Sequence, residues 1–195
     1  MPGYGRAPFQ LPAVVFLPAY YLSLSLLLYL ASLFFAGAHM SGGYQLSALQ
    51  MLIYGPWGMP FGLFQWFANP LFALAVLAHR RFRRLALLAG VGALYMALGS
   101  FAIERLPDNV SYAFHDVTAL GLGFYLWALA LLAFCAGQAW HCWKARSALD
   151  VPGWRWWDGA MIVALLAVVY AGLQTPALRF EPGAVLMPAE QGQVL

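Results

Sequence analysis

Charge is what this sequence most lacks. Only 9% of its 195 residues are charged, whereas 63% are hydrophobic. An ordinary soluble domain is roughly a quarter charged, so this chain has too little polar surface to cover a water-soluble fold of its size. The apolar excess must face lipid. We therefore predict an integral membrane protein made of one domain.

The chain also lacks the motifs of common catalytic and metal sites. It contains no P-loop, no HExxH, no GxSxG and no CxxC. Its cysteines, Cys135 and Cys142, are two helical turns apart, about 10 Å along a helix, whereas a disulfide needs Cα atoms about 4.4–6.8 Å apart. We predict that they are packing residues, and we predict no catalytic residue, no metal site and no cofactor.

Five apolar stretches are long enough to cross a membrane. A helix needs about 20 apolar residues to cross a hydrocarbon core of ~30 Å, and within lipid a single segment satisfies its own backbone only as a helix. We therefore predict an all-α, multi-pass transmembrane bundle over residues 1–195. The predicted spans cover about 13–38, 60–78, 85–103, 117–140 and 159–178, and an irregular tail follows at 179–195.

The first span has a second interpretation. Arg6 precedes it, and Ala36-Gly37-Ala38 resembles the small-residue cleavage site of a secretory signal. Cleavage there would leave four spans. The apolar run is longer than a usual signal and is interrupted by Pro18, which favours retention.

The basic residues predict the orientation. Positive residues collect on the cytoplasmic side of membrane proteins, so we expect a cytoplasmic N-terminus and a C-terminus outside. The preference for Arg over Lys in a chain rich in Ala, Leu and Gly suggests a GC-rich bacterial genome, and we predict the bacterial cytoplasmic (inner) membrane. The cytoplasmic set is Arg6, Arg80, Arg81, Arg83, Arg84, Lys144, Arg146 and Arg155, whereas Arg105 and Arg179 fall on the other side.

The same basic residues indicate the partner. They lie between apolar runs rather than on a soluble face, which excludes nucleic acid and leaves the lipid bilayer. The residues expected to set topology and to contact anionic lipid headgroups are Arg80, Arg81, Arg83, Arg84, Lys144 and Arg146.

The connection between the first two spans contains an apolar segment at residues 44–54. Leu46, Leu49 and Ile53 have the spacing of one helical face. The segment is uncharged and too short to cross a membrane. It is predicted either to lie flat in the interface or to dip into the membrane and return as a re-entrant segment.

The second span contains a candidate polar site within the membrane. Gln65 and Asn69 share a helical face, and Pro70 removes the donor for the carbonyl of Trp66. One hypothesis is a broken helix that lines a transport site. The other is a proline kink whose amides bond to neighbouring helices.

The run Trp66-Phe67-Ala68-Asn69-Pro70-Leu71, a W-x-A-N-P-L motif, precedes a basic turn, and Gly121-Leu122-Gly123 opens a later span. This combination resembles small bacterial multi-pass membrane proteins of uncharacterised function. The resemblance covers spans two to four. It implies a helical membrane fold and no activity, and no functional residue is transferred from it.

The histidines suggest one redox alternative. His39 and His115 are expected outside, and His79 and His141 inside. A membrane haem b protein that holds two haems, each between two imidazoles, would have one such pair near each side. The spacing places them at or beyond the headgroups, which favours interfacial histidines instead.

The predicted outer loop after the third span carries other polar residues, namely Glu104, Arg105, Asp108 and Asp116. Glu104 and Arg105 are expected either to form a local ion pair or to anchor the helix end. His115 with Asp108 and Asp116 offers the ligands of a metal or acid–base site, but three such residues in a solvated loop favour solvation instead.

Three functional hypotheses follow. The first is a non-enzymatic accessory or scaffold subunit of a membrane complex, with another membrane protein as partner, because the sequence offers neither a catalytic constellation nor a soluble domain. The second is a small transporter or channel that uses the kinked helix at Asn69-Pro70. The third is the membrane haem b redox protein.

Overall fold

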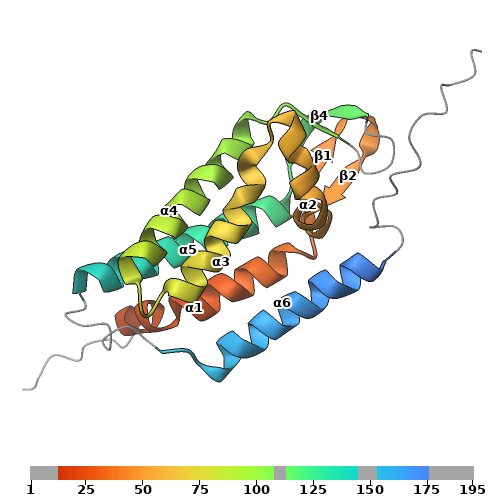
Figure 1. The fold of residues 1–195 in the computed structure, drawn as a ribbon. Helices are drawn as coiled ribbons and strands as arrows, with labels where there is room; N and C mark the ends of the chain where they lie inside the picture. The colour runs from red at the N-terminus through yellow and green to blue at the C-terminus, as the bar shows by residue number, and fades with distance from the viewer. Residues whose placement is uncertain (1–12, 108–112, 145–152, 176–195) are drawn as a thin grey trace, which may run out of the picture.

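Long helices run side by side through the molecule (Figure 1). The structure is a computed structural model that describes residues 13–107, 113–144 and 153–175. The long helices are α1 (Ala13–Ser32), α3 (Ala68–Ala78), α4 (Arg83–Leu98), α5 (Leu122–Lys144) and α6 (Trp156–Gln174). Shorter pieces are α2 (Ala48–Tyr54) and the 3-10 turns η1 (Ser41–Gly43), η2 (Gly55–Phe61), η3 (Phe64–Phe67) and η4 (Gly99–Ala102).

A small antiparallel sheet covers one end of the helices (Figure 1). Its strands lie in the order β2-β1-β4-β3. Ala38 of β1 pairs with Leu46 of β2 on one side and with Leu120 of β4 on the other. The strands are β1 (Ala36–Met40), β2 (Gln45–Ser47), β3 (Arg105–Pro107) and β4 (Phe114–Leu120).

The all-α prediction is therefore right for the helices and wrong for this sheet. The predicted spans 13–38 and 117–140 each included strand residues, because the parts of β1 and β4 that they contain, residues 36–38 and 117–120, carry no charge and are separated from a helix by at most three residues. Their peptide groups bond to another strand rather than along a helix, which satisfies the backbone equally well. Ala36–Ala38, the alternative cleavage site, lies within β1.

Three helical segments are long and apolar enough to cross a membrane, counted over the described residues: Arg83–Ala102, Leu122–Lys144 and Trp156–Gln174. Two shorter apolar segments, Tyr20–Ser32 and Phe64–Ala78, lie among them. Helix α3 itself has 11 residues, or ~16 Å, about half a hydrocarbon core. It begins eight residues after the predicted start of its span, because η2 and η3 occupy that stretch.

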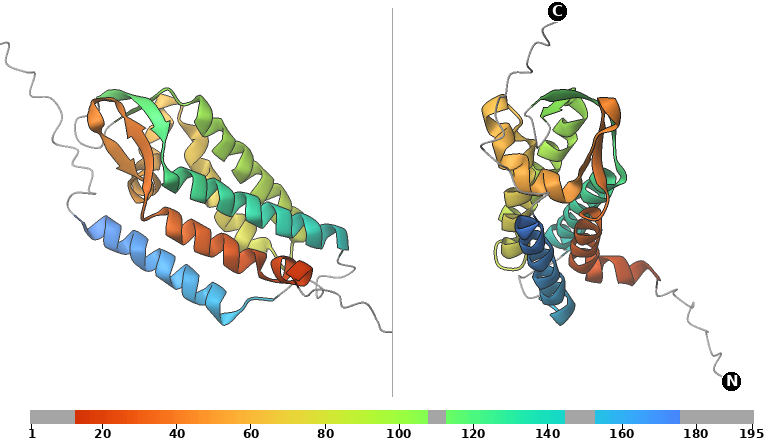
Figure 2. Two further views of the ribbon diagram at one scale, coloured as in Figure 1. Left: turned by 180° about the vertical axis from the view of Figure 1, so that it is seen from behind. Right: turned by 90° about the vertical axis from the view of Figure 1, so that its right-hand side faces the viewer.

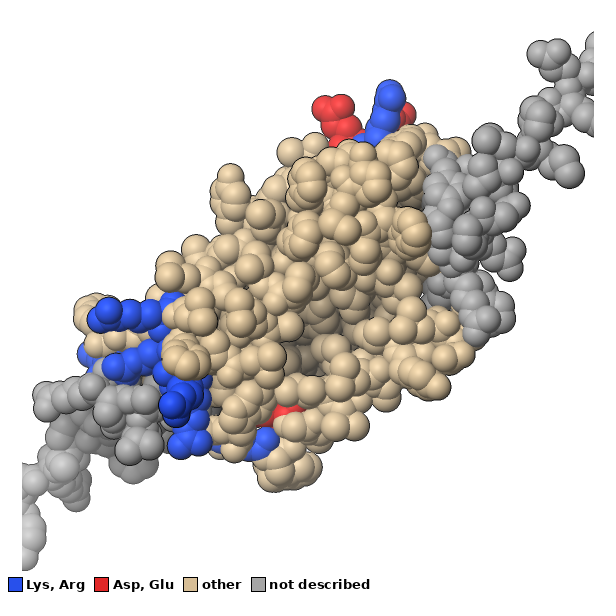
Figure 3. Space-filling view, in the orientation of Figure 1, with Lys and Arg blue, Asp and Glu red and all other residues tan. Residues whose placement is uncertain are grey.

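Charge separates to the two ends of the molecule, and the described surface between them in Figure 3 carries almost no charged residue. We call the end that holds the α3–α4 turn the arginine end, and the opposite end the sheet end. All described basic residues except Arg105 lie at the arginine end. This arrangement agrees with an apolar belt between two headgroup zones.

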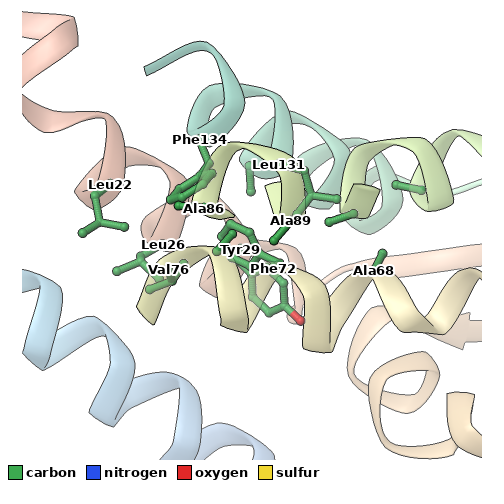
Figure 4. Close-up of a cluster of buried hydrophobic side chains, with 14 of the residues drawn as sticks. Leu22, Leu26, Tyr29, Ala68, Phe72, Val76, Ala86, Ala89, Leu131 and Phe134 are labelled. Atoms are coloured by element: carbon green, nitrogen blue, oxygen red, sulfur yellow. The ribbon is translucent and has the colours of Figure 1, made fainter. Parts of the chain in front are cut away.

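The core is built by small residues on α4 that face large residues on its neighbours (Figure 4). Ala86 and Ala89 are buried, and a Cβ on Gly90 would lie 3.1 Å from the Phe134 ring of α5. Phe72 of α3 packs against Phe134, with ring centroids 5.6 Å apart. Close van der Waals contact of this kind drives helix association in lipid, where apolar burial alone gives little.

Glycine brings the start of α5 against the end of α1. A Cβ on Gly123 would lie 2.8 Å from the carbonyl oxygen of Phe35, and a Cβ on Gly121 would lie 2.2 Å from that of Ala36. The Gly121 amide donates to the Gly37 carbonyl at 2.9 Å. The Gly121-Leu122-Gly123 run is therefore a packing device where helix becomes strand.

Helix α6 is the least enclosed of the long helices. Only 11% of its apolar window is buried inside the protein. Figure 2 shows that it lies along α1 and apart from α4, and Figure 3 shows a hollow on the face between α6 and the rest of the bundle. Most of α6 is therefore available to lipid or to another protein.

Candidate functional site

A partly open cavity of about 150 Å³ lies inside the sheet end of the bundle. Helices, 3-10 turns and strands all contribute to its wall, which is mostly apolar and includes no charged residue or histidine among the residues that the structure describes. The aromatic part of the lining consists of Tyr29, Tyr54, Trp66, Phe124 and Trp127. Its polar part includes Ser32, Gln65, Asn69 and Ser100.

Asn69 joins three elements at this cavity. Its side-chain oxygen accepts hydrogen bonds from the Tyr29 hydroxyl of α1 at 2.8 Å and from the Trp127 indole of α5 at 3.1 Å. Its side-chain nitrogen donates to the Trp66 carbonyl at 3.1 Å. That carbonyl is the one that Pro70 leaves without its helical donor. The Asn69 amide thus repairs the proline break and ties α3 to two neighbouring helices.

Trp66 fixes α2 over the cavity. Its indole donates to the Leu52 carbonyl at 2.8 Å, and its ring occupies the space that a side chain on Gly55 would need, with Cδ1 only 1.8 Å from an ideal Cβ. Helix α2 begins with a capping box, in which Ser47 and Gln50 exchange hydrogen bonds. The predicted interfacial or re-entrant segment 44–54 is thus strand β2 followed by this short capped helix.

Gln65 is the polar group of the lining that stands out chemically. Its amide oxygen Oε1 is buried and has no hydrogen-bond partner, and its side chain lies 3.7 Å from the position of a Cβ on Gly99. An unmatched acceptor in an apolar setting costs free energy. The structure thus brings two of the three predicted polar residues, Gln65 and Asn69, to one cavity, whereas Pro70 is exposed.

A second polar network holds the arginine end together. The fully buried Gln138 of α5 accepts from the Tyr21 hydroxyl at 2.7 Å and donates to the carbonyls of His79 and Arg83, both at 3.1 Å. Cys142 also approaches the Arg83 carbonyl, at 3.5 Å. One amide therefore connects α1, the end of α3 and the start of α4.

Asp158 anchors α6 to α1. Its carboxylate accepts from the Ser23 hydroxyl at 2.6 Å and from the backbone amide of Arg155 at 2.9 Å, and it is 2% exposed. The guanidinium carbon of Arg155 lies 3.9 Å from the centroid of the Tyr20 ring. These contacts satisfy the first turn of α6 and hold an otherwise little-packed helix.

The predicted headgroup residues gather at this same end. Arg80, Arg81 and Arg84 are exposed and Arg83 is half-buried. Lys144 is exposed and lies over the rings of Trp140 and Trp143, with Nζ 5.4 and 5.5 Å from their centroids. Arg146 is outside the described residues.

Three of the histidines pack against aromatic rings. His79, next to the arginine cluster, is fully buried in the protein; its Nδ1 lies 2.8 Å from the Val76 carbonyl and its ring packs against Trp154. His141 packs against Tyr21, and His115 against Tyr44. No group of three His, Cys, Asp or Glu side chains that could hold a metal occurs within the described ranges. The haem hypothesis remains a prediction.

The predicted outer loop contains β3 and β4. Arg105 pairs with Asp116 at 2.9 Å across these strands, because the strand register places these two residues opposite each other. The alternative of a local ion pair between Glu104 and Arg105 is therefore not the one that forms. Asp108 is outside the described residues. Both cysteines are free, as expected of packing residues.

The sequence analysis missed the residues that carry most of the polar contacts. Gln138 is an amide inside an apolar span, the same signal that singled out Gln65. Asp158 is an acid in the first turn of a helix, which is a capping signal. Tyr29 and Trp127 have no local signal, because only the fold brings them to Asn69.

The fold and the cavity define the class of protein: an apolar helical bundle with a four-stranded antiparallel sheet over one end. Within the described ranges, three of its helical segments are long and apolar enough to cross a membrane. No family model matches the sequence. No curated protein and no solved structure matches it either.

Proposed function

We propose that this chain is a non-enzymatic membrane protein that binds a small, uncharged, lipid-soluble molecule in the cavity at its sheet end. The observation that carries the proposal is the cavity itself, an apolar hollow lined by aromatic rings and by a few amide and hydroxyl groups. Pockets that are mainly apolar, with a few convergent polar groups, are the usual form of small-molecule sites.

The backbone around the cavity supports this proposal. The stretch from Gly55 to Phe67 consists of the 3-10 turns η2 and η3, joined at Gly62 and Leu63, rather than α-helix. Irregular backbone at membrane depth is tolerated where it is buried in protein or lines a cavity. A helix that simply crossed the membrane would have no need of this interruption, whereas a binding site requires walls from several directions.

Occupancy of the cavity can be tested by extraction. The protein is purified in nanodiscs, washed and denatured, and the released small molecules are measured by mass spectrometry. Leu63→Phe places a larger side chain on the cavity wall, and we expect at least a fivefold loss of the retained compound. Leu94→Phe is the matched control, because Leu94 is also partly buried but packs against the core away from the cavity. Equal retention by all three proteins would refute the proposal.

A second candidate function is that of an accessory subunit of a membrane complex. Helix α6 favours it, because this helix contacts the bundle along α1 yet is almost unburied over its apolar length. Photocrosslinkers at the exposed Leu166 and Tyr170 of α6 should then capture a membrane protein. The same crosslinker at the exposed Leu88 of α4 is the comparison. Capture of lipid alone from both helices would count against this function.

We also propose the finer location, a bacterial inner membrane with the arginine end in the cytoplasm, and anionic lipid headgroups around the exposed arginines. The asymmetry of basic residues between the two ends supports it. Cysteines introduced at Arg81 and Thr118, both exposed, should react with a membrane-impermeant maleimide from opposite sides of sealed vesicles. Labelling of both from one side would refute this topology.

A further inference from the structure

We infer that one anionic phospholipid binds in a groove between α6 and the rest of the bundle, with its phosphate at the arginine end and an acyl chain along the groove. This site is separate from the cavity. It rests on the proposed orientation, in which the arginine end lies among lipid headgroups. The shape of the groove, its length and the charge at its mouth carry the inference.

Helix α6 leaves a groove because it packs on one side only. Among the described elements it packs broadly against α1 and α2 and makes no comparable contact with α3. Figure 1 shows α1 between α3 and α6, and Figure 3 shows a hollow there in the same orientation. Helices α3 and α6 are therefore the walls of the groove, and α1 is its floor.

The sides of the groove are apolar. Helix α6 turns the partly buried Ile162, Leu165 and Val169 toward the bundle core. Leu26 of α1 and Val76 of α3 belong to that core (Figure 4). A surface of this kind offers van der Waals contact to an acyl chain and no hydrogen-bonding partner to a polar ligand.

The length of the groove matches one leaflet of a bilayer. Its α3 wall has 11 residues, or ~16 Å, and half of a hydrocarbon core is ~15 Å. Near the sheet end α2 meets α6, because a Cβ on Gly172 would lie 2.8 Å from Ile53 and 3.1 Å from Leu49. The groove therefore opens at the arginine end and closes within the membrane, as a site for a lipid of one leaflet requires.

Each wall of the groove meets an arginine at its mouth. Arg80 follows α3, and Arg155 precedes the first residue of α6. The Arg80 Nη1 atom lies 3.4 Å from the position of a Cβ on Gly153, two residues before Arg155. Guanidinium groups bind phosphate oxygens through paired hydrogen bonds, and basic pockets between helices on the cytoplasmic side take anionic headgroups.

Asp158 does not cancel this positive charge. It is the one acidic residue at the arginine end within the described ranges, and its carboxylate already accepts hydrogen bonds from Ser23 and from the Arg155 backbone. The exposed Arg81 and Arg84 add further positive charge at the same end. The mouth therefore favours an anionic headgroup over a zwitterionic one.

Lipid retention tests the headgroup. The full chain in detergent is equilibrated with equal amounts of phosphatidylglycerol and phosphatidylethanolamine that have the same acyl chains, and the retained lipid is measured by native mass spectrometry. We expect the protein to retain phosphatidylglycerol in preference, and Arg80→Gln to lower this retention about fivefold, the effect expected of one charge beside a headgroup. Arg84→Gln is the matched control, because it removes the same charge from an exposed position on α4 and should leave retention unchanged. Equal loss in both variants, or equal retention of the two lipids by the unchanged protein, overturns the inference.

Photocrosslinking tests the groove. A phosphatidylglycerol with a diazirine near the end of one acyl chain is added in limiting amount and activated by light. We expect crosslinks at Leu165 or Val169 of α6 in preference to the exposed Leu88 of α4, and an excess of unlabelled phosphatidylglycerol should suppress them. Crosslinks spread evenly over both helices, or suppression by glycerol phosphate as strong as that by the lipid, overturns the inference.

Failure here differs from failure of the proposed function. The extraction assay depends on Leu63, which lines the cavity, and maleimide labelling reports the orientation independently. Labelling from opposite sides together with no preference for phosphatidylglycerol would refute the lipid site and leave both of those proposals standing.

Discussion

Replacement of Asn69 by leucine separates a structural role from a transport role at the kinked helix. Leucine keeps the volume approximately and removes both polar atoms. The Tyr29 hydroxyl and the Trp127 indole then lose their acceptor, and the Trp66 carbonyl loses the donor that stands in for Pro70. The contacts therefore predict lost stability.

The magnitude follows from the hydrogen bonds. Interhelical hydrogen bonds in a membrane protein average about 0.6 kcal/mol and reach about 1.7 kcal/mol. Two such bonds, to α1 and α5, give an expected loss of about 1–3 kcal/mol for Asn69→Leu. Tyr29→Phe removes a single bond and leaves Asn69 joined to Trp127, so about 0.5–1.5 kcal/mol is expected for it.

Steric-trap unfolding in bicelles measures these free energies directly. The double variant Tyr29→Phe/Asn69→Leu should lose less free energy of unfolding than the two single variants lose in sum, because both substitutions break the same Tyr29–Asn69 hydrogen bond. A loss below about 0.3 kcal/mol for Asn69→Leu would refute the structural reasoning. If such a stable variant also lost flux in liposomes, the transport hypothesis would take its place.

Three further predictions test other contacts. Gly123→Ala should lower the free energy of unfolding by about 1–3 kcal/mol, because its Cβ would meet three backbone oxygens within 2.9 Å. Gly159→Ala should raise it by about 0.5–1 kcal/mol, because nothing lies within 4 Å of its Cβ. Thermal unfolding in detergent compares the two variants, and equal effects would contradict the packing. Gln138→Leu should cost about 2–4 kcal/mol by the same measurement, because the Tyr21 hydroxyl loses its acceptor and the carbonyls of His79 and Arg83 lose the amide donor. An unchanged melting point would be incompatible with this network. Asp158→Ala should reduce the free energy that holds the first turn of α6 against α1 by about 1–2 kcal/mol. Hydrogen exchange should then rise in the first turn of α6 and remain unchanged in α4. Exchange in α6 equal to that of the unchanged protein would count against this anchor.

The helices were predictable from the sequence because lipid imposes a simple rule on them. Long uncharged runs must be helical, and α4, α5 and α6 follow that rule. The sheet was not predictable in the same way, because its strands are short and two of them, β1 and β4, lie within a few residues of apolar helices. The pairing of Ala38 with Leu120 joins segments far apart in the sequence, and no local pattern reports it.

The candidate site was half predictable for a related reason. An amide inside an apolar run is conspicuous, so Gln65 and Asn69 could be singled out from the sequence. What they contact could not, since Tyr29 and Trp127 belong to other helices and look like ordinary membrane aromatics. The cavity itself has no sequence signature, because strands, turns and helices from most of the chain contribute to its wall.

The pairing of β1 with β4 also sets an order for assembly. Strand β1 leaves the ribosome early, together with β2, but its other neighbour is made only when residues 114–120 have been synthesised. Until then the residues that β3 adds to the cavity wall, Leu106 and Pro107, have no β4 to hold them. A nascent chain that stopped after α4 would therefore present an unfinished site, and a compound that fits the finished one could act as a late assembly aid.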